Sequence, residues 1–479
     1  MTYGILTLDD TLGLVLPVSI LAFLVCLIFQ SVLLVLRIFL PISATSPKRT
    51  EKKDGSNSND SQNGSLNFKS LVFLFVLCYL LQPLGTMLHL RGQRQNMEFS
   101  SRSQKRSGLH DLVYGKDPLM KTLLDKIPSL RRGPKPPFLW SNRHLQFFPW
   151  LLQNEMHRQE GIPFQRMDLE VTACLDKSTP ECIRDPLMND TITLDVFPPF
   201  DDVQNQYPGF HAGSPIIFFS PGLRCHSHDL PGTMIIRRAF AKGIRSVVVN
   251  RRGHTPDRKL RAPRFNLFGD VHDLEQSYWH IHEHYAAPHT PSFLHGISSG
   301  TAVVVSALAE FDKRRWLAAV VEASSTNNNN ETTTAKATFD NGWDTLYGQQ
   351  QQQHRGVAPS FIASVSVVPG YDISKVMMPE RFKYPYNPLL TESVKDHFVR
   401  TNEDVLRAYD SEAVDLALEA DNLQDFVNAV APFAGYPNAT EYYKGENPIN
   451  DMQYITTPKL VLNSIDDPCV SLWCQQLLW

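Results

Sequence analysis

One short segment of the chain carries the residue types of a covalent catalyst. Residues 292 to 304 read SFLHGISSGTAVV, so that Ser298 lies between Gly296 and Gly300. One apolar run precedes this Gly-x-Ser-x-Gly motif and another follows it, which predicts a strand, a tight turn and a buried helix. Such an elbow lifts the serine hydroxyl above a sheet. Ser298 is therefore predicted to be a nucleophile; the alternative is a purely structural Gly/Ser turn.

Two backbone groups are predicted to stabilise the negative charge that an attack by this serine creates. The N–H of Ser299, directly after the nucleophile, points toward the reacting carbonyl in an elbow of this kind. The second donor is expected in the loop SPGLRCHSHD, residues 220 to 229, which follows an earlier apolar run. There Gly222 lets the backbone approach closely, and Leu223 is predicted to supply its N–H.

A carboxylate that orients the catalytic base is expected after a late strand. The segment LVLNSIDDPCV, residues 460 to 470, offers Asp466 and Asp467. Asp467 is preferred because it begins an Asp-x-x-Val sequence that is typical of acid loops, and Asp466 then caps the turn. The choice between these two carboxylates stays open at this point.

The histidines give no pattern of metal ligands. They cluster in the loop after residue 220 and on a helical stretch, as His226, His228, His280, His282 and His284. Without cysteine or acidic ligands at matching spacing, we expect ordinary surface histidines. The proposed chemistry needs neither a metal nor an organic cofactor.

The overall composition limits the classes of function. The 479 residues are 42% hydrophobic and 20% charged, with a formal net charge of -3. This balance, without a long basic run, argues against a nucleic-acid partner. Among seven cysteines, Cys174 and Cys182 could form a local disulfide, although unpaired residues are the favoured interpretation.

Two apolar segments near the N-terminus predict a membrane anchor. No charge occurs from residue 12 until Arg37, which predicts a transmembrane helix over about residues 12–36. A second span is predicted over about residues 70–90, although a proline and a glycine weaken its second half. We expect an integral membrane protein of an endomembrane. The side of the catalytic domain stays open, because basic residues occur both between the two segments and after the second.

The chain is predicted to divide at about residue 110. Residues 1–110 hold the anchor and polar linkers, whereas residues 111–479 alternate compact apolar runs with helical patterns. The predicted strands lie in residues 215–222, 244–253, 291–296, 316–324 and 458–467. This alternation predicts an α/β domain with a mostly parallel central sheet and helices on both faces.

Two features interrupt the alternation. Asn-, Thr- and Gln-rich tracts predict a low-complexity surface insertion at residues 325–356. Residues 357–445 then carry helical patterns between two predicted strands, so we expect a helical lid above the edge of the sheet.

Several motifs together resemble the α/β-hydrolase fold, specifically the membrane-anchored α/β-hydrolase-domain lipases and esterases and their bacterial relatives. WSNRHLQFFPWL resembles the Asn-Gly-His-x-Gln-Thr segment of this family, with Arg143 for Gly and Phe147 for Thr. PGLRCHS resembles its His-Gly-Leu loop, with Pro221 for His. VVVNRRGH, followed by APRFNLFGDVHDL, resembles its Asn-x-Arg-Gly and Pro-Arg segments, and residues 435–467 resemble its Tyr-Tyr and Asp-Asp signature. The resemblance runs from about residue 137 to the end, apart from the insertion.

The resemblance implies a membrane-bound serine hydrolase. Ser298 is the implied nucleophile, Leu223 and Ser299 the oxyanion donors, and Asp467 the acid. The implied substrates are acylglycerols, phospholipids or short-chain acyl esters, cleaved through an acyl-enzyme. Two alternatives remain: a catalytically inactive membrane-tethered binding or scaffold protein, and a lipid acyltransferase. Protein partners are not indicated.

The catalytic base is the one missing element. In this family it is a histidine that follows the acid by one further helix and strand. All 16 histidines precede Asp467, the last being His397, and PCVSLWCQQLLW follows it. We therefore expect this sequence to be truncated, with the base and the final strand lost, because the sheet would otherwise keep an unpaired apolar edge.

Overall fold

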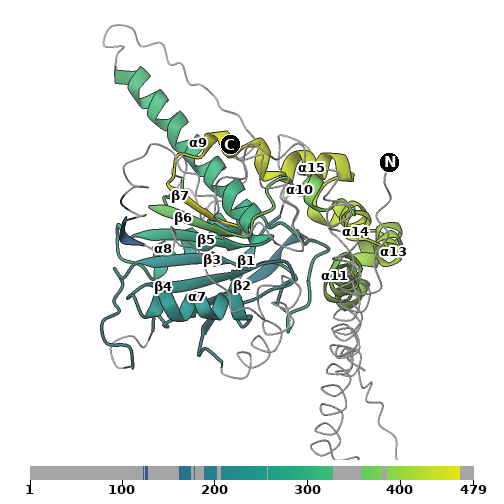
Figure 1. Cartoon of the computed structure of the whole chain (residues 1–479), viewed down its shortest axis with the longest axis horizontal. Helices are drawn as coiled ribbons and strands as arrows, with labels where there is room; N and C mark the ends of the chain where they lie inside the picture. The colour runs from purple at the N-terminus through teal and green to yellow at the C-terminus, as the bar shows by residue number, and fades with distance from the viewer. Residues whose placement is uncertain are drawn as a thin grey trace, which may run out of the picture. The chain divides into compact units, whose positions relative to one another are not determined.

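A seven-stranded sheet forms the centre of the computed structural model (Figure 1). Its strands are β1 (Gln165–Val171), β2 (Asp190–Phe197), β3 (Ile216–Ser220), β4 (Arg245–Asn250), β5 (Ser292–Ile297), β6 (Ala363–Val367) and β7 (Lys459–Leu462). They are arranged in the order β1-β2-β4-β3-β5-β6-β7. β2 is antiparallel to both of its neighbours, while β4, β3, β5, β6 and β7 run parallel to one another. The expected mostly parallel sheet is confirmed.

The structure describes residues 122, 125–127, 161–173, 177, 188–201, 206–255, 257–326, 358–379 and 386–463. The elements named here all belong to the unit Tyr114–Trp479. Both predicted transmembrane segments, the Cys174–Cys182 pair and residues 327–357 lie outside the described residues. Within the described ranges, no helix has the length and apolar character needed to cross a bilayer.

Helices cover both faces of the sheet. They are α7 (Leu230–Phe240), α8 (Val271–His284) and α9 (Gly300–Thr326). Ile236 of α7 packs against Phe219 and Val248, whereas α8 and α9 pack over Phe218 and Val247. Because alternate residues of a strand point to opposite faces, these side chains belong to two separate apolar layers. Accordingly, α7 and α9 lie on opposite sides of the sheet (Figure 1).

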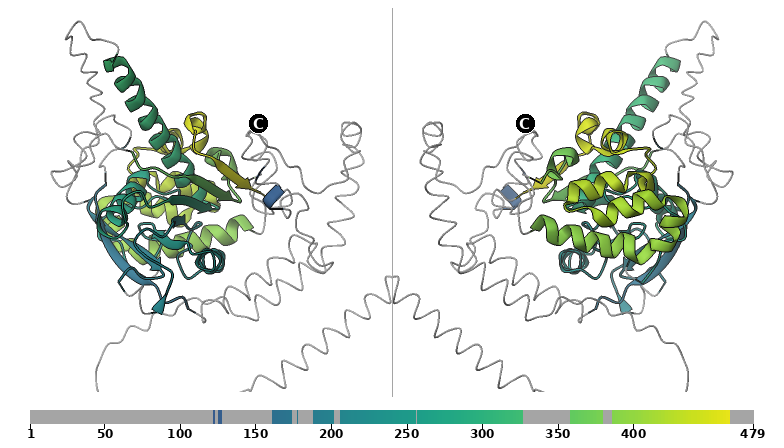
Figure 2. Two further views of the ribbon diagram at one scale, coloured as in Figure 1. Left: turned by 90° about the vertical axis from the view of Figure 1, so that its left-hand side faces the viewer. Right: turned by 90° about the vertical axis from the view of Figure 1, so that its right-hand side faces the viewer.

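The strand predicted at residues 316–324 is wrong, because this segment is the last part of helix α9. Its alanines, leucine and glutamate favour a helix, and the helix that starts after the serine simply continues. β6 takes the position beside β5 instead. Trp316 is 63% exposed, which a strand buried on both faces would not allow. The end of α9 extends beyond the sheet in both further views (Figure 2).

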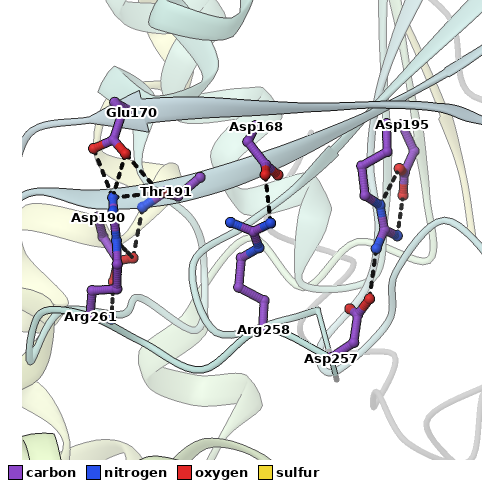
Figure 3. Close-up of polar contacts among 9 residues, drawn as sticks. Asp168, Glu170, Asp190, Thr191, Asp195, Asp257, Arg258 and Arg261 are labelled. Atoms are coloured by element: carbon purple, nitrogen blue, oxygen red, sulfur yellow. Dashed lines mark hydrogen bonds and ion pairs between the residues drawn. The ribbon is translucent and has the colours of Figure 1, made fainter.

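Charged side chains of β1 fasten the loop that follows β4. Arg166, Asp168 and Glu170 alternate along β1 and so share one face of the strand. Their ion pairs are Arg166 with Asp257 at 2.8 Å, Asp168 with Arg258 at 2.6 Å and Glu170 with Arg261 at 2.7 Å (Figure 3). These contacts are solvent-accessible, so each contributes little stability, but together they hold the loop over the β1–β2 edge.

A group of helices lies between β6 and β7 in the chain. They are α10 (Ile373–Val376), α11 (Tyr386–Val394), a π-helix (Lys395–Val399), α12 (Glu403–Tyr409), α13 (Ser411–Glu419), α14 (Leu423–Ala429) and α15 (Ala439–Glu446), with short 3₁₀ turns at 400–402, 431–434, 448–450 and 452–454. Asp410, Asn422 and Asn438 cap α13, α14 and α15 through side-chain oxygens.

These helices share an apolar core with the loops of the sheet. Phe398 and Phe433 pack with Phe265, from the loop after β4, and Ala302, from the start of α9, belongs to the same cluster. The helices therefore lie at the carboxyl ends of the parallel strands. The predicted lid range 357–445 begins too early, because it includes the core strand β6.

Candidate active site

The sheet topology places a switch point at the carboxyl ends of β3 and β5. From β3 the chain crosses to β4 on one side, and β5 then pairs with β3 on its other side. The loops after β3 and β5 therefore start from neighbouring strands and lead in opposite directions. In open α/β sheets such a switch point is the place where ligands bind.

Ser298 occupies a sharp turn at this point. It follows β5 directly and has a φ of 51°, in the left-handed region that a side chain rarely adopts. Its N–H donates to Val367 O at 2.9 Å, which ties the turn to the end of β6, and its carbonyl oxygen accepts from Thr301 N–H at 2.9 Å. The Ser298 side chain is exposed. This left-handed turn between a strand and a helix has the backbone geometry expected of the predicted elbow.

The two glycines of the motif are required by close backbone approach. A Cβ on Gly300 would lie 2.3 Å from the carbonyl oxygens of both Ser220 and Pro221. A Cβ on Gly296 would lie 2.7 Å from Gly300 O. Backbone atoms cannot move aside as a flexible side chain would. The motif therefore lets the loop after β3 pack directly onto the start of α9.

We expect Gly300→Ala to destabilise the fold by about 3 kcal/mol, the upper end of the cost of overpacking. The reason is the collision with the Ser220 and Pro221 carbonyls. Denaturant midpoints measure the effect, and Gly243→Ala is the control. Gly243 has φ +72° and open space around it, so it should lose about 1 kcal/mol through backbone strain alone. Equal losses in the two variants would contradict the steric explanation.

The predicted oxyanion loop borders Ser298. A Cβ built on Gly222 would lie 3.4 Å from Ser298 Cβ. Leu223 is half-buried, and the next residue, Arg224, has a φ of 61°. Within the described part of the chain, the N–H groups of Leu223 and Ser299 donate to no protein acceptor. The structure thus brings three of the four predicted site residues together.

A buried carboxylate that the sequence interpretation missed fixes the far side of this loop. Asp195 of β2 is fully buried and accepts hydrogen bonds from Ser227 Oγ at 2.5 Å and Asn250 Nδ2 at 2.8 Å. Asn250 Oδ1 in turn accepts from Ser227 N–H at 3.0 Å. Arg166 pairs with the same carboxylate at 2.8 Å. The Asn-x-Arg-Gly motif was the available signal, but the partners of its Asn250 come from β2 and from the loop after β3.

Asp467, the predicted acid, lies outside the described residues, as does Asp466. The strand before them, β7, runs parallel to β6, and β6 runs parallel to β5. The carboxyl end of β7 therefore lies at the same edge of the sheet as the serine turn.

The sequence predicted ordinary surface histidines, and for the loop after β3 this prediction is wrong. His226 and His228 are half-buried, and only His284 of the helical set is exposed. Among the described residues, no three His, Cys, Asp or Glu side chains are arranged to hold a metal ion. His254 is fully buried beside His397, with 6.4 Å between ring centroids.

These buried imidazoles predict sensitivity to acid. Burial lowers the pKa of His295 and His397 to about 4, and the charges of Arg224 and His226 add to the effect at His397. The unfolded chain takes up these protons near pH 6.5 while the folded protein does not, so stability is complete above that pH and falls as the pH approaches 4. Denaturation midpoints against pH measure this slope.

The variant His397→Leu should make the slope shallower, because one buried titrating group is removed. His284→Leu is the matched control on an exposed helix position and should leave the slope unchanged. If both variants kept the original slope, the buried imidazole of His397 would not be a source of the acid sensitivity.

Comparison with known proteins gives distant sequence relatives that are named as lipases and esterases. No family model matches the chain. It is 24% identical over 272 residues to phospholipase ABHD3 of Bos taurus, covering 56% of this chain and 54% of that protein. It is 24% identical over 374 residues to monoacylglycerol lipase ABHD2 of Danio rerio, covering 75% and 70% respectively. It is also 55% identical over 40 residues to medium-chain fatty acid ethyl ester synthase/esterase 2 of Saccharomyces cerevisiae, covering 8% and 9%.

The match thus spans about half the length of the bovine phospholipase. By its mostly parallel sheet and the serine turn between β5 and α9, the chain has the α/β-hydrolase fold, and its sequence is similar to proteins named as lipases and esterases.

Proposed function

We propose that the protein hydrolyses carboxylic esters of lipids through an acyl-enzyme on Ser298. The observation that carries this proposal is the left-handed Ser298 turn, which borders the Gly222–Leu223 loop. Left-handed strain at a non-glycine residue is tolerated where it serves function. Backbone N–H groups without a protein acceptor next to it are suited to an oxyanion.

The proposed reaction has two steps. Ser298 Oγ attacks the ester carbonyl and passes its proton to a base, which in this fold is a histidine oriented by a carboxylate such as Asp467. The N–H groups of Leu223 and Ser299 stabilise the oxyanion until the carbon–oxygen bond breaks and the alcohol leaves with the proton. Water, activated by the same base, then attacks the acyl-enzyme and releases the carboxylic acid.

The proposed substrates are acylglycerols, phospholipids or short-chain acyl esters. Two relatives are named a phospholipase and a monoacylglycerol lipase, which supports this class. The helices α10 to α15 share an apolar core with the loops at the site, and we propose that they act as a lid. Anchoring by the apolar segments 12–36 and 70–90 in an endomembrane would bring the site to lipids.

The test uses protein expressed from the complete natural transcript, including any sequence beyond residue 479. A fluorophosphonate probe is expected to label Ser298, and the protein is expected to cleave p-nitrophenyl butyrate, a monoacylglycerol or phosphatidylcholine. A folded protein that neither labels nor cleaves any of these esters would support the non-catalytic binding protein instead. Alkaline carbonate extraction of membranes tests the anchor, since a peripheral protein would be released.

Acyl transfer is the second candidate, favoured by one observation. A relative that matches over 40 residues is named an ethyl ester synthase/esterase. Transfer uses the same acyl-enzyme, with an alcohol in place of water as the acceptor. Product analysis in the presence of ethanol separates the two, because transfer forms an ethyl ester while hydrolysis forms the free acid.

A further inference from the structure

A single buried arginine contacts both segments that are proposed to hold the oxyanion. Arg251 directly follows β4 and is 4% exposed. Its Nη2 donates to the carbonyl oxygens of Pro221 and Gly222, each at 3.0 Å, and to Ser299 Oγ at 3.1 Å. Its Nη1 donates to Leu267 O at 2.8 Å. The two terminal nitrogens of the guanidinium are thus held by acceptors from different segments of the chain.

The contact with Gly222 sets the direction of a proposed donor. Gly222 C=O and Leu223 N–H belong to one peptide unit, and in a trans peptide these two bonds point in opposite directions. With the oxygen held by Arg251, the N–H of Leu223 points away from the guanidinium. A charged donor on the carbonyl also polarises the peptide, which strengthens its N–H as a hydrogen-bond donor.

The charge of Arg251 is not neutralised nearby. No carboxylate of the described residues forms an ion pair with it, and its acceptors are carbonyl and hydroxyl oxygens. Burial lowers the pKa of Arg251 to about 10, so the guanidinium remains charged at neutral pH. A positive charge in a poorly solvated place favours negative charge that develops close by.

We propose that Arg251 is a positioning residue of the oxyanion hole. It holds the Gly222–Leu223 peptide and Ser299 in place next to Ser298, and it acts through them without touching the substrate. This inference rests on the proposed ester hydrolysis at Ser298. Arg251 occupies the variable position of the Asn-x-Arg-Gly motif, so family resemblance alone gives it no role.

The experiment compares Arg251→Met and Arg251→Lys in the full-length protein, with p-nitrophenyl butyrate as the substrate. Arg251→Met is expected to lower kcat about 10- to 100-fold while KM changes by less than about twofold, because the lost interaction acts in the transition state. The kcat of Arg251→Lys should lie between those of Arg251→Met and the unsubstituted protein, because lysine keeps the positive charge but not the planar guanidinium. The rate of labelling by a fluorophosphonate should fall with kcat.

Arg245 provides a matched control at the other end of the same strand. It is fully buried, donates to the carbonyl oxygens of Pro198 and His211, and has its pKa lowered to about 10 by burial. Arg245→Met should lower thermal stability about as much as Arg251→Met. Its kcat should nevertheless stay within about twofold of the unchanged protein, because the oxyanion loop is not among its partners.

Hydrogen exchange gives a readout that does not depend on turnover. Amides of residues 222–226 and 298–302 should exchange faster in Arg251→Met than in Arg245→Met. An unchanged kcat in Arg251→Met, or equal losses in both methionine variants, would overturn the role of Arg251. If Ser298 of the unsubstituted protein neither reacted with the probe nor supported turnover, the proposed function would be overturned. The role inferred for Arg251 would then be overturned with it.

Discussion

Ser298→Ala is expected to reduce ester hydrolysis by a factor on the order of 10⁴ or more and to abolish fluorophosphonate labelling. The reason is that the acyl-enzyme cannot form without Oγ, and a neighbouring hydroxyl cannot replace it because the elbow turn fixes one residue at the switch point. Initial rates and gel-based probe labelling of the full-length protein measure both effects. Thermal stability should stay the same or rise, since alanine keeps the backbone of the turn and removes only an exposed hydroxyl.

Ser306→Ala is the matched control. Ser306 lies on α9, the helix that follows the elbow, and is half-buried. Its loss should leave hydrolysis and labelling within about twofold. Full activity in Ser298→Ala, with the unchanged protein active, would mean that another residue carries the acyl group and would remove the basis of the proposed mechanism.

Asp273→Asn is expected to destabilise the fold by about 3 to 5 kcal/mol. Asp273 accepts from Arg252 at 2.6 and 2.9 Å, and the two side chains are 4% and 5% exposed. The substitution removes the carboxylate that pairs directly with the buried Arg252 charge. The pair joins the chain after β4 to the first turn of α8, and Arg252 also donates to Thr172 O at 2.9 Å. Chemical denaturation midpoints measure the loss.

Arg258→Ala is the control, because it removes an exposed ion pair in place of a buried one. Arg258 pairs with Asp168 at 2.6 Å, but the two side chains are 37% and 47% exposed, so its loss should cost less than about 1 kcal/mol. The double variant Arg252→Met/Asp273→Leu should recover part of the stability lost in Asp273→Asn, because it removes both buried charges. If Asp273→Asn cost no more than Arg258→Ala, the buried pair would have no structural role.

The central strands β3, β4 and β5 were predictable from the sequence because they are buried on both faces of the sheet. β3, β4 and β5 fall inside the predicted runs 215–222, 244–253 and 291–296, apart from Ile297 at the end of β5. Continuous apolar runs of this length are typical of such strands. The helices α7 and α8 likewise match the helical patterns between them. The strand predicted from local composition at residues 316–324 was wrong, because this apolar run of helix-forming residues continues α9.

β1 and β2 were not predicted. β1 alternates charged and apolar residues over QRMDLEV, because its polar face pairs with the loop after β4. β2 is fully buried although it contains aspartates and threonines. The Asp195 carboxylate is stable there because Arg166, Ser227 and Asn250 satisfy it. These three partners come from three different segments, so they give no local signal in the sequence.

By itself the sequence determined the nucleophile candidate, the loop opposite it and the α/β alternation, because each depends on neighbours within a few residues along the chain. Only the tertiary structure decided which side chains support that site. Arg251, at the end of β4, reaches the loop after β3 and the turn after β5 because the strand order places β3 between β4 and β5. That order arises from packing of the whole domain, and no short stretch of residues encodes it.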